Sequence, residues 1–244
     1  MEPAARFEDL KIPVPSAEGG LEVSGVLGIP EWWPSGARVG VILAPGASGR
    51  HDEPLVEDLH RELTERKFLT LRFNFPFGEA KKKRADPMLT LRQTYRAAVQ
   101  ILSADPTSAP AHVFIGGVGL GAKVASVVAT DRIRVTGLFS LGYPLHPARK
   151  PDKAEAEQLY RIITPMLFVQ GSKSQNCDLD VLRRCLARVG APTGLHVVDE
   201  ADHLFKVSPC LFSECLYCFI RFVIFSPILQ PLKCVFKINL FEHF

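Results

Sequence analysis

The stretch at residues 114–123 constrains the fold of this chain more than any other feature, because glycine recurs at every second position of a tight turn. It reads Phe-Ile-Gly-Gly-Val-Gly-Leu-Gly-Ala-Lys, with an apolar run before the turn and a helix-forming run after it. Glycines at Gly117 and Gly121 allow a strand and a helix to approach without Cβ clashes. The sequence therefore predicts a buried strand that passes directly into a helix.

Strand and helix signals alternate along the first 207 residues. Short apolar runs predict strands at 21–29, 39–44, 68–73, 113–116, 135–141, 166–170 and 195–198, and longer patterned stretches predict helices at 54–66, 89–102, 121–129 and 179–189. This order predicts an α/β fold, with a mostly parallel twisted sheet and helices on both faces. Ligands of such sheets bind beyond the carboxyl ends of the strands, so functional residues are expected directly after strands.

Charge and cysteine usage exclude several classes of function. The 29 basic and 26 acidic residues give a net charge of +3, which is too small for a nucleic-acid-binding surface. The first ten residues lack the basic start and apolar centre of a signal peptide. The six cysteines fit neither a zinc site nor a disulfide framework, although Cys215 and Cys218 form a C-x-x-C pair. We therefore expect a cytoplasmic or nuclear protein with no metal and no cofactor.

Gly119 lies at the centre of the turn, where a nucleophile elbow carries a serine or cysteine in a strained backbone conformation. Glycine tolerates that conformation, but it has no side-chain atom with which to form an acyl-enzyme. Two other interpretations exist. The pattern Gly117-x-Gly119-x-x-Ala122 matches a loose dinucleotide-binding fingerprint, but residues 140–143 (Ser-Leu-Gly-Tyr), which end the next predicted strand, lack the expected acid. The glycines could also serve strand–helix packing alone.

Four motifs together resemble α/β-hydrolase-fold proteins related to dienelactone hydrolases. Within that family, the motifs resemble the group that contains testis-expressed protein 30 and the third regulatory subunit of the NSL histone acetyltransferase complex. Residues 43–49 (LAPGASG) are similar to the family's HGASG loop, 116–123 (GGVGLGAK) to its GGRSMGSR elbow, 143–146 (YPLH) to its YPLH element, and 200–203 (EADH) to the segment that carries its histidine. The resemblance covers roughly residues 7–207 and implies an α/β-hydrolase fold.

This resemblance implies roles for individual residues. His203 occupies the position of the catalytic histidine, whereas Gly119 replaces the nucleophile serine. Ser174 stands where relatives have the aspartate of a Gly-Ser-x-Asp run. Asp178 follows four residues later and is expected to cap the next helix. Two of the three triad positions are thus altered, which argues against the ordinary serine-hydrolase mechanism.

Further residues are expected around the same cleft. Ala47 and Leu120 would supply the backbone N–H groups of an oxyanion hole, which need no particular side chain. Tyr143 and His146 are candidates for lining the pocket, although His146 could equally make structural hydrogen bonds. Ser48 is a candidate for a displaced nucleophile, while a serine in such a loop more commonly bonds its own backbone.

The leading hypothesis is a non-catalytic hydrolase relative that binds a small acyl or carbonyl ligand, or a protein partner, through the old cleft. One alternative is a weak esterase that uses His203 with Ser48 or water. Another is a scaffold subunit of a protein complex. Neither nucleic acid nor a cofactor is expected as a partner.

Two segments stand apart from the rest of the chain. Residues 1–207 are expected to form the hydrolase-like domain, whereas residues 208–244 form an atypical apolar tail that contains seven of the sixteen phenylalanines. If the chain associates with a membrane, this tail is the expected route. Glu214, Arg221 and Pro227 interrupt its apolar stretch, which argues against a spanning helix. The basic run at 81–84 (Lys-Lys-Lys-Arg) is expected to be a solvated loop, with a nuclear-localisation signal as the alternative.

Overall fold

A computed structural model describes residues 5–15, 19–32, 38–104, 109–131, 133–203 and 205. The strands of its eight-stranded sheet are β1 (Arg6–Val14), β2 (Leu21–Ile29), β3 (Val39–Ala44), β4 (Leu69–Phe73), β5 (His112–Val118), β6 (Gly137–Leu141), β7 (Met166–Gly171) and β8 (Thr193–Val198). The helices are α1 (Pro54–Glu65), α2 (Pro76–Glu79), α3 (Met88–Ala104), α4 (Leu120–Val128) and α5 (Leu179–Leu186), with short 3₁₀ turns η1 (Pro151–Lys153) and η2 (Leu159–Arg161). The predicted tail at 208–244 lies outside the described residues.

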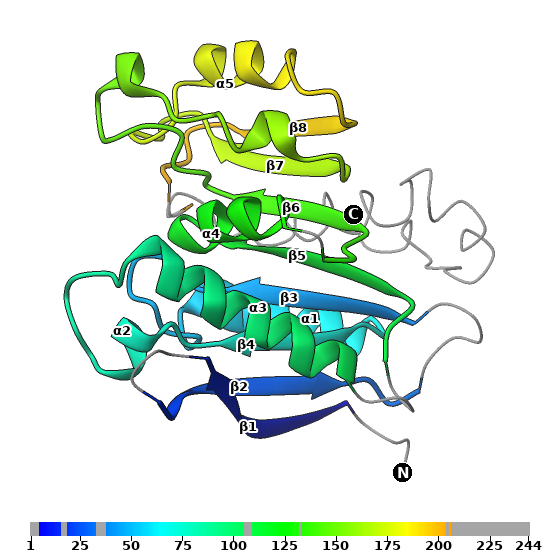
Figure 1. Cartoon of the computed structure of the whole chain (residues 1–244). Helices are drawn as coiled ribbons and strands as arrows, with labels where there is room; N and C mark the ends of the chain where they lie inside the picture. Colours follow the sequence, from blue (N-terminus) through cyan, green and yellow to red (C-terminus); the bar gives the residue numbers. More distant parts are fainter. Residues whose placement is uncertain are drawn as a thin grey trace.

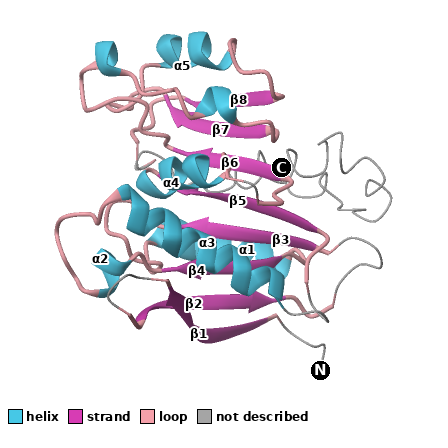
Figure 2. Cartoon of the chain, in the orientation of Figure 1, coloured by secondary structure: helices cyan, strands magenta, loops and turns pink. Residues whose placement is uncertain are grey.

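The sheet has the order β1-β2-β4-β3-β5-β6-β7-β8. Strands β4, β3, β5, β6, β7 and β8 pair in parallel, whereas β2 is antiparallel to both β1 and β4. The predicted α/β architecture with a mostly parallel twisted sheet is therefore confirmed (Figure 1). The arrowheads of β3 to β7 point to one edge of the sheet, and that edge is where a ligand is expected (Figure 2).

Helices cover both faces of this sheet, because the parallel strands are apolar on both sides. Within β3, Ile42 and Ala44 pack into the cluster that includes α3, α4 and α5, whereas Val41 and Leu43 pack into the cluster that includes α1. Figure 1 accordingly shows α3 and α4 in front of the sheet and α1 behind it. None of the helices in the described part of the chain is both long and apolar enough to span a bilayer.

One buried histidine makes the stability of this fold depend on pH. His60 of α1 is 1% exposed, and its ring centroid lies 5.3 Å from that of Phe7 in β1. Burial lowers the pKa of His60 to about 3, and the positive charges of Arg72 and His51 act in the same direction. The folded protein therefore keeps this imidazole neutral.

Acidification is expected to destabilise the protein through His60. Its pKa in the folded state lies below the unfolded value of about 6.5, so the stability contribution is complete above that pH and is lost as the pH falls towards 3. The expected loss is about 2 kcal/mol at roughly pH 5. Urea unfolding across this range should show it. A His60→Gln variant should have a flatter profile, although His51 and His112, whose pKa values burial also lowers, remain in it. Parallel profiles would contradict this assignment.

Candidate functional site

The turn between β5 and α4 has the backbone geometry of an elbow. Gly119 has φ 51° and ψ −111°, in the left-handed region that disfavours residues with a Cβ atom. Its N–H donates to the Leu141 carbonyl at the end of β6 (2.8 Å), and its carbonyl accepts from Lys123 N–H in α4 (3.1 Å). The turn is thus fixed from both sides.

The three alternate glycines of the turn have different surroundings. A Cβ on Gly117 would lie 2.4 Å from the Ala44 carbonyl oxygen, and one on Gly121 would lie 2.5 Å from that of Pro45. A Cβ on Gly119 would meet no atom of the described residues within 4 Å. The outer glycines are therefore required by the close approach of β3, whereas a side chain at position 119 would project into space that no described residue occupies.

The segment that carries His203 crosses the ends of two neighbouring strands. A Cβ on Gly142, directly after β6, would lie 2.5 Å from the His203 carbonyl oxygen, and one on Gly171 at the end of β7 would lie 2.3 Å from that of Ala201. Because the Leu141 carbonyl accepts the hydrogen bond from Gly119 N–H, the elbow and His203 both lie beside the end of β6. The half-buried His203 imidazole has no hydrogen-bond partner among the described residues.

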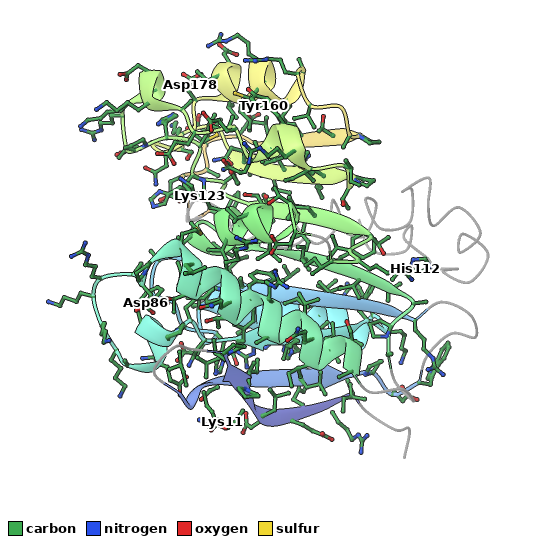
Figure 3. All side chains as sticks on the ribbon, viewed as in Figure 1. Lys11, Asp86, His112, Lys123, Tyr160 and Asp178 are labelled. Carbon is green, nitrogen blue, oxygen red and sulfur yellow. The ribbon has the colours of Figure 1, made fainter. Side chains whose placement is uncertain are left out.

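Ser174, at the position where the resemblance implies the acid, has no carboxylate. Ser174 follows β7, and its buried hydroxyl oxygen has no partner among the described residues. Asp178 accepts from the N–H groups of Asp180 (3.0 Å) and Val181 (2.9 Å), which confirms that it caps α5. Figure 3 shows Asp178 beside α5 at the top of the molecule. The Asp178 carboxylate is thus occupied by hydrogen bonds to the first turn of its own helix.

The loop after β3 is organised by Glu53, which the sequence analysis did not single out. Its carboxylate accepts from Gly46 N–H (2.8 Å), from Ser48 N–H (3.2 Å) and from the Ser48 hydroxyl. The Ser48 oxygen also accepts from Arg50 N–H (3.0 Å). Ser48 is thus engaged within its own loop. The only signal in the sequence was an acidic residue directly before Pro54, at the start of the following helix.

The two expected oxyanion donors remain available. Ala47 is exposed between Gly46 and Ser48, and its N–H has no acceptor within the described residues. Leu120 is the first residue of α4, so its N–H has no acceptor within the helix. Backbone N–H groups without an acceptor are the kind of donor that stabilises an oxyanion in hydrolases.

Tyr143 lies in the core on the α4 side of the sheet. It is fully buried, and its hydroxyl accepts from Gln158 Nε2 (2.6 Å) and lies 3.3 Å from Ser126 Oγ. Burial raises the pKa of Tyr143 to about 12. The described contacts thus hold this phenol within the fold.

His146 links the loop after β6 to the loop after β7. Its Nε2 accepts from Asp178 N–H (2.8 Å), so the proton lies on Nδ1, which donates to the Pro147 carbonyl (2.9 Å). Of the two interpretations offered for His146, these bonds correspond to the structural one. Cys177 is also buried here, and burial raises the pKa of its thiol to about 12, which disfavours a thiolate. Within the described residues, no three His, Cys, Asp or Glu side chains gather as metal ligands.

Comparison with known proteins agrees with this fold. Residues 37–210 match the protein family described as an alpha/beta hydrolase domain. Among solved structures, the chain is similar to dienelactone hydrolase from Anabaena variabilis, with 19% identity, a TM-score of 0.72, and coverage of 90% of this chain and 97% of that one. An α/β serine hydrolase homologue from Coxiella burnetii has 20% identity, a TM-score of 0.69, and coverage of 88% and 96%. Ferulic-acid-bound Est1E from Butyrivibrio proteoclasticus has 15% identity, a TM-score of 0.69, and coverage of 86% and 97%.

Proposed function

This chain belongs to the α/β-hydrolase family, and we propose that it is a member without a nucleophile, which binds a small acyl or carbonyl ligand instead of hydrolysing it. The observation that carries this proposal is glycine at the centre of an intact elbow, where the backbone still has the geometry that would project a nucleophile. With no hydroxyl or thiol at this point, no acyl-enzyme can form there.

The ligand class follows from the donors that remain. The N–H groups of Ala47 and Leu120 belong to the backbone, and they survive the loss of any side chain. Glu53 fixes the amides on both sides of Ala47, which holds that loop in one conformation. A carbonyl or carboxylate oxygen is the group to which such N–H donors donate most readily.

The finer placement within the family is also part of the proposal. The four motifs support a position near dienelactone hydrolases and the group of testis-expressed protein 30, with residues 1–207 as the functional unit. The reducing setting expected from the cysteines supports a cytoplasmic or nuclear location.

The protein should therefore bind an ester without hydrolysing it. Wild type is expected to be thermally stabilised, in a saturable manner, by p-nitrophenyl butyrate while releasing no nitrophenolate above background. Gly119→Leu should abolish the stabilisation by filling the space that no described residue occupies, whereas Gly119→Ala, with the same left-handed backbone, should retain it. Both the thermal shift and the release of nitrophenolate are measured on the same samples.

The competing hypothesis is a weak esterase that uses His203 with Ser48 or water. It requires turnover by pure wild type that His203→Ala abolishes. That result would overturn the proposal, and Ser48→Ala would then identify the nucleophile. Absence of both turnover and thermal stabilisation would exclude the hypothesis of a small acyl or carbonyl ligand. The hypothesis of a scaffold subunit would then remain.

A further inference from the structure

Strand β1 forms one end of the sheet. It pairs with β2 over its whole length, from Arg6↔Ile29 to Val14↔Leu21, and among the described residues no strand pairs with its other side. Figure 1 shows β1 as the outermost strand. The outward backbone N–H and C=O groups of such a strand can form hydrogen bonds with a further strand. The edge of β1 is therefore a surface on which another strand can pair.

Pro13 shows which backbone groups of β1 point to this free edge. Proline has no N–H, so within a sheet it is found where its nitrogen points away from the neighbouring strand. Pro13 lies opposite Glu22 of β2, so its nitrogen is expected to face the free edge. Because backbone groups alternate in direction along an antiparallel strand, those of Phe7, Asp9 and Lys11 face the same way. These residues would form the hydrogen bonds to an added strand.

The side chains of the same four residues share one face of the sheet. Phe7 contacts His60 of α1, with ring centroids 5.3 Å apart, so this is the face that α1 covers. Phe7, Asp9, Lys11 and Pro13 are all exposed there. The free edge therefore presents an aromatic, an acidic, a basic and an apolar side chain, in that order.

This order is self-complementary. Two copies of β1 that pair about a two-fold axis run antiparallel, and opposite residues lie on the same face. With the axis at Leu10, all nine residues of β1 are paired, Asp9 lies opposite Lys11 of the second copy, and Phe7 lies opposite Pro13. An axis at residue 9 or 11 would instead place two aspartates or two lysines opposite each other. Full pairing and opposite charges thus coincide in one register.

We propose that this protein forms a two-fold dimer through β1, which joins the two sheets into one. Opposite charges that face each other across two strands stabilise the pair, whereas unpaired charges at an edge oppose the addition of a neutral strand. The charges of β1 therefore favour a second copy over an unrelated segment. The proposal concerns the end of the sheet, and it stands whether or not the cleft binds an acyl ligand.

Lys11 is able to serve both its own chain and the second copy. Its Nζ donates to Ser24 Oγ (2.8 Å) and lies 3.6 Å from Glu79 Oε1. Its side chain is nevertheless 61% exposed, and an ammonium group has three N–H donors. A donor thus remains for Asp9 of the second copy.

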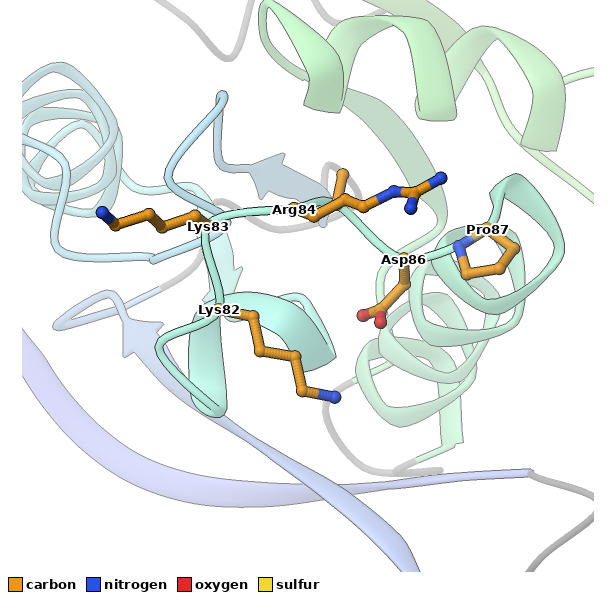
Figure 4. A pocket seen from close by; sticks show the side chains of 6 residues that line it. Lys82, Lys83, Arg84, Asp86 and Pro87 are labelled. Carbon is orange, nitrogen blue, oxygen red and sulfur yellow. The ribbon is translucent and has the colours of Figure 1, made fainter.

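The basic run at 81–84 is unsuited to the same contact. Its four residues are exposed, as expected for a solvated loop. Figure 4 shows Lys82, Lys83 and Arg84 around the hollow that they line together with Asp86. A two-fold contact brings a surface against itself, so the cations of this loop would meet one another.

The first test is sedimentation equilibrium of the full chain at increasing protein concentration. Wild type should form a species of twice the 27.0 kDa chain mass, and added salt should weaken it. Asp9→Lys turns two opposite-charge pairs into two like-charge pairs, so it should raise the dimer dissociation constant at least about tenfold. Glu157→Lys makes the same charge change on an exposed residue before β7, at the other end of the sheet, and should have less than about a threefold effect. A wild type that stays monomeric, or equal effects of the two substitutions, would overturn the proposal.

Mixing two charge variants tests the register. Asp9→Lys has two cations on the exposed face of β1, and Lys11→Glu has two carboxylates there, so each should dimerise poorly alone. An equimolar mixture should form a heterodimer with a dissociation constant within about threefold of the wild-type value, because every charge then meets its opposite. Melting curves show whether each variant is folded. Folded variants that do not associate when mixed would contradict the proposed pairing.

A cysteine at the two-fold axis tests the geometry without relying on charge. Leu10 would lie opposite Leu10 of the second copy with Cα atoms about 4.5 Å apart, so Leu10→Cys should form an intermolecular disulfide in oxidised glutathione. Glu8→Cys is the control on the same strand and face, but its two Cα atoms would be roughly 14 Å apart. Mass spectrometry of the linked peptides separates these bonds from those of the six natural cysteines. No cross-link at position 10, or equal cross-linking at both positions, would overturn the proposal.

Discussion

Gly119→Ser is expected to give this protein an esterase activity that the wild type lacks. The left-handed backbone at position 119 would direct the new hydroxyl into space that no described atom occupies, and both Gly119 and His203 lie beside the end of β6. In a serine protease, removing the serine costs about 10⁶ in kcat and removing the aspartate alone about 10⁴. Restoring a serine without the acid should therefore raise hydrolysis of p-nitrophenyl butyrate by about 10²-fold.

Completing the triad should raise the rate further. Gly119→Ser/Ser174→Asp places a carboxylate at the expected acid position after β7. A rate gain of up to about 10⁴-fold over the single variant would equal the loss in kcat that removing the aspartate causes in a serine protease. Gly119→Ala is the matched control, because it introduces the same Cβ without a hydroxyl. A burst of nitrophenolate that matches the enzyme concentration would identify the acyl-enzyme. If the single and double variants fold and remain as inactive as Gly119→Ala, the cleft does not have the expected geometry.

Gly121→Ala is expected to be among the most damaging single substitutions in the described part of the chain. Its Cβ would lie 2.5 Å from the Pro45 carbonyl oxygen and 2.6 Å from that of Ala44, and neither backbone atom can rotate away. Overpacking a close contact costs about 1–3 kcal/mol, and a rigid backbone neighbour places this case at the upper end. The melting temperature should fall by about 6–12 °C for a domain of this size.

The control for this loss lies two residues away. In Gly119→Ala the Cβ meets none of the described residues, so this variant should cost only the left-handed backbone preference, about 1–2 kcal/mol. Differential scanning calorimetry of the two variants separates steric contact from backbone strain. A larger loss at position 119 than at 121 would show that β3 and α4 can move apart.

The local pattern of the sequence was sufficient for most of the fold. The predicted strands at 21–29 and 39–44 coincide with β2 and β3, and the stretch at 114–123 does pass from strand to helix. The sequence analysis missed β1, whose outward residues are charged and which contains Pro13, and α2, which is too short for a periodic signal. The placement of β4 between β2 and β3 depends on long-range pairing, which no local pattern contains.

The candidate site was predictable only in part, for a physical reason. Residues directly after parallel strands must gather at one edge, so position 119 could be placed there from the strand pattern. The role expected for His203 came from the family resemblance. Contacts between distant segments could not be foreseen, such as the bond from Gln158 to Tyr143 or the acceptor role of Glu53 in the preceding loop. Such bonds depend on side chains whose neighbours are set by the completed fold.

The left-handed backbone at Gly119 also has a consequence for the energy stored in this turn. An enzyme with serine there must hold an L-residue in a conformation that costs about 1–2 kcal/mol, and the rest of its fold has to supply that energy. Glycine adopts the same conformation without that penalty, so the turn is relaxed while its shape is retained. Reactivity and stability are therefore opposed at this one position, and any variant selected for catalysis there must begin with a less stable fold.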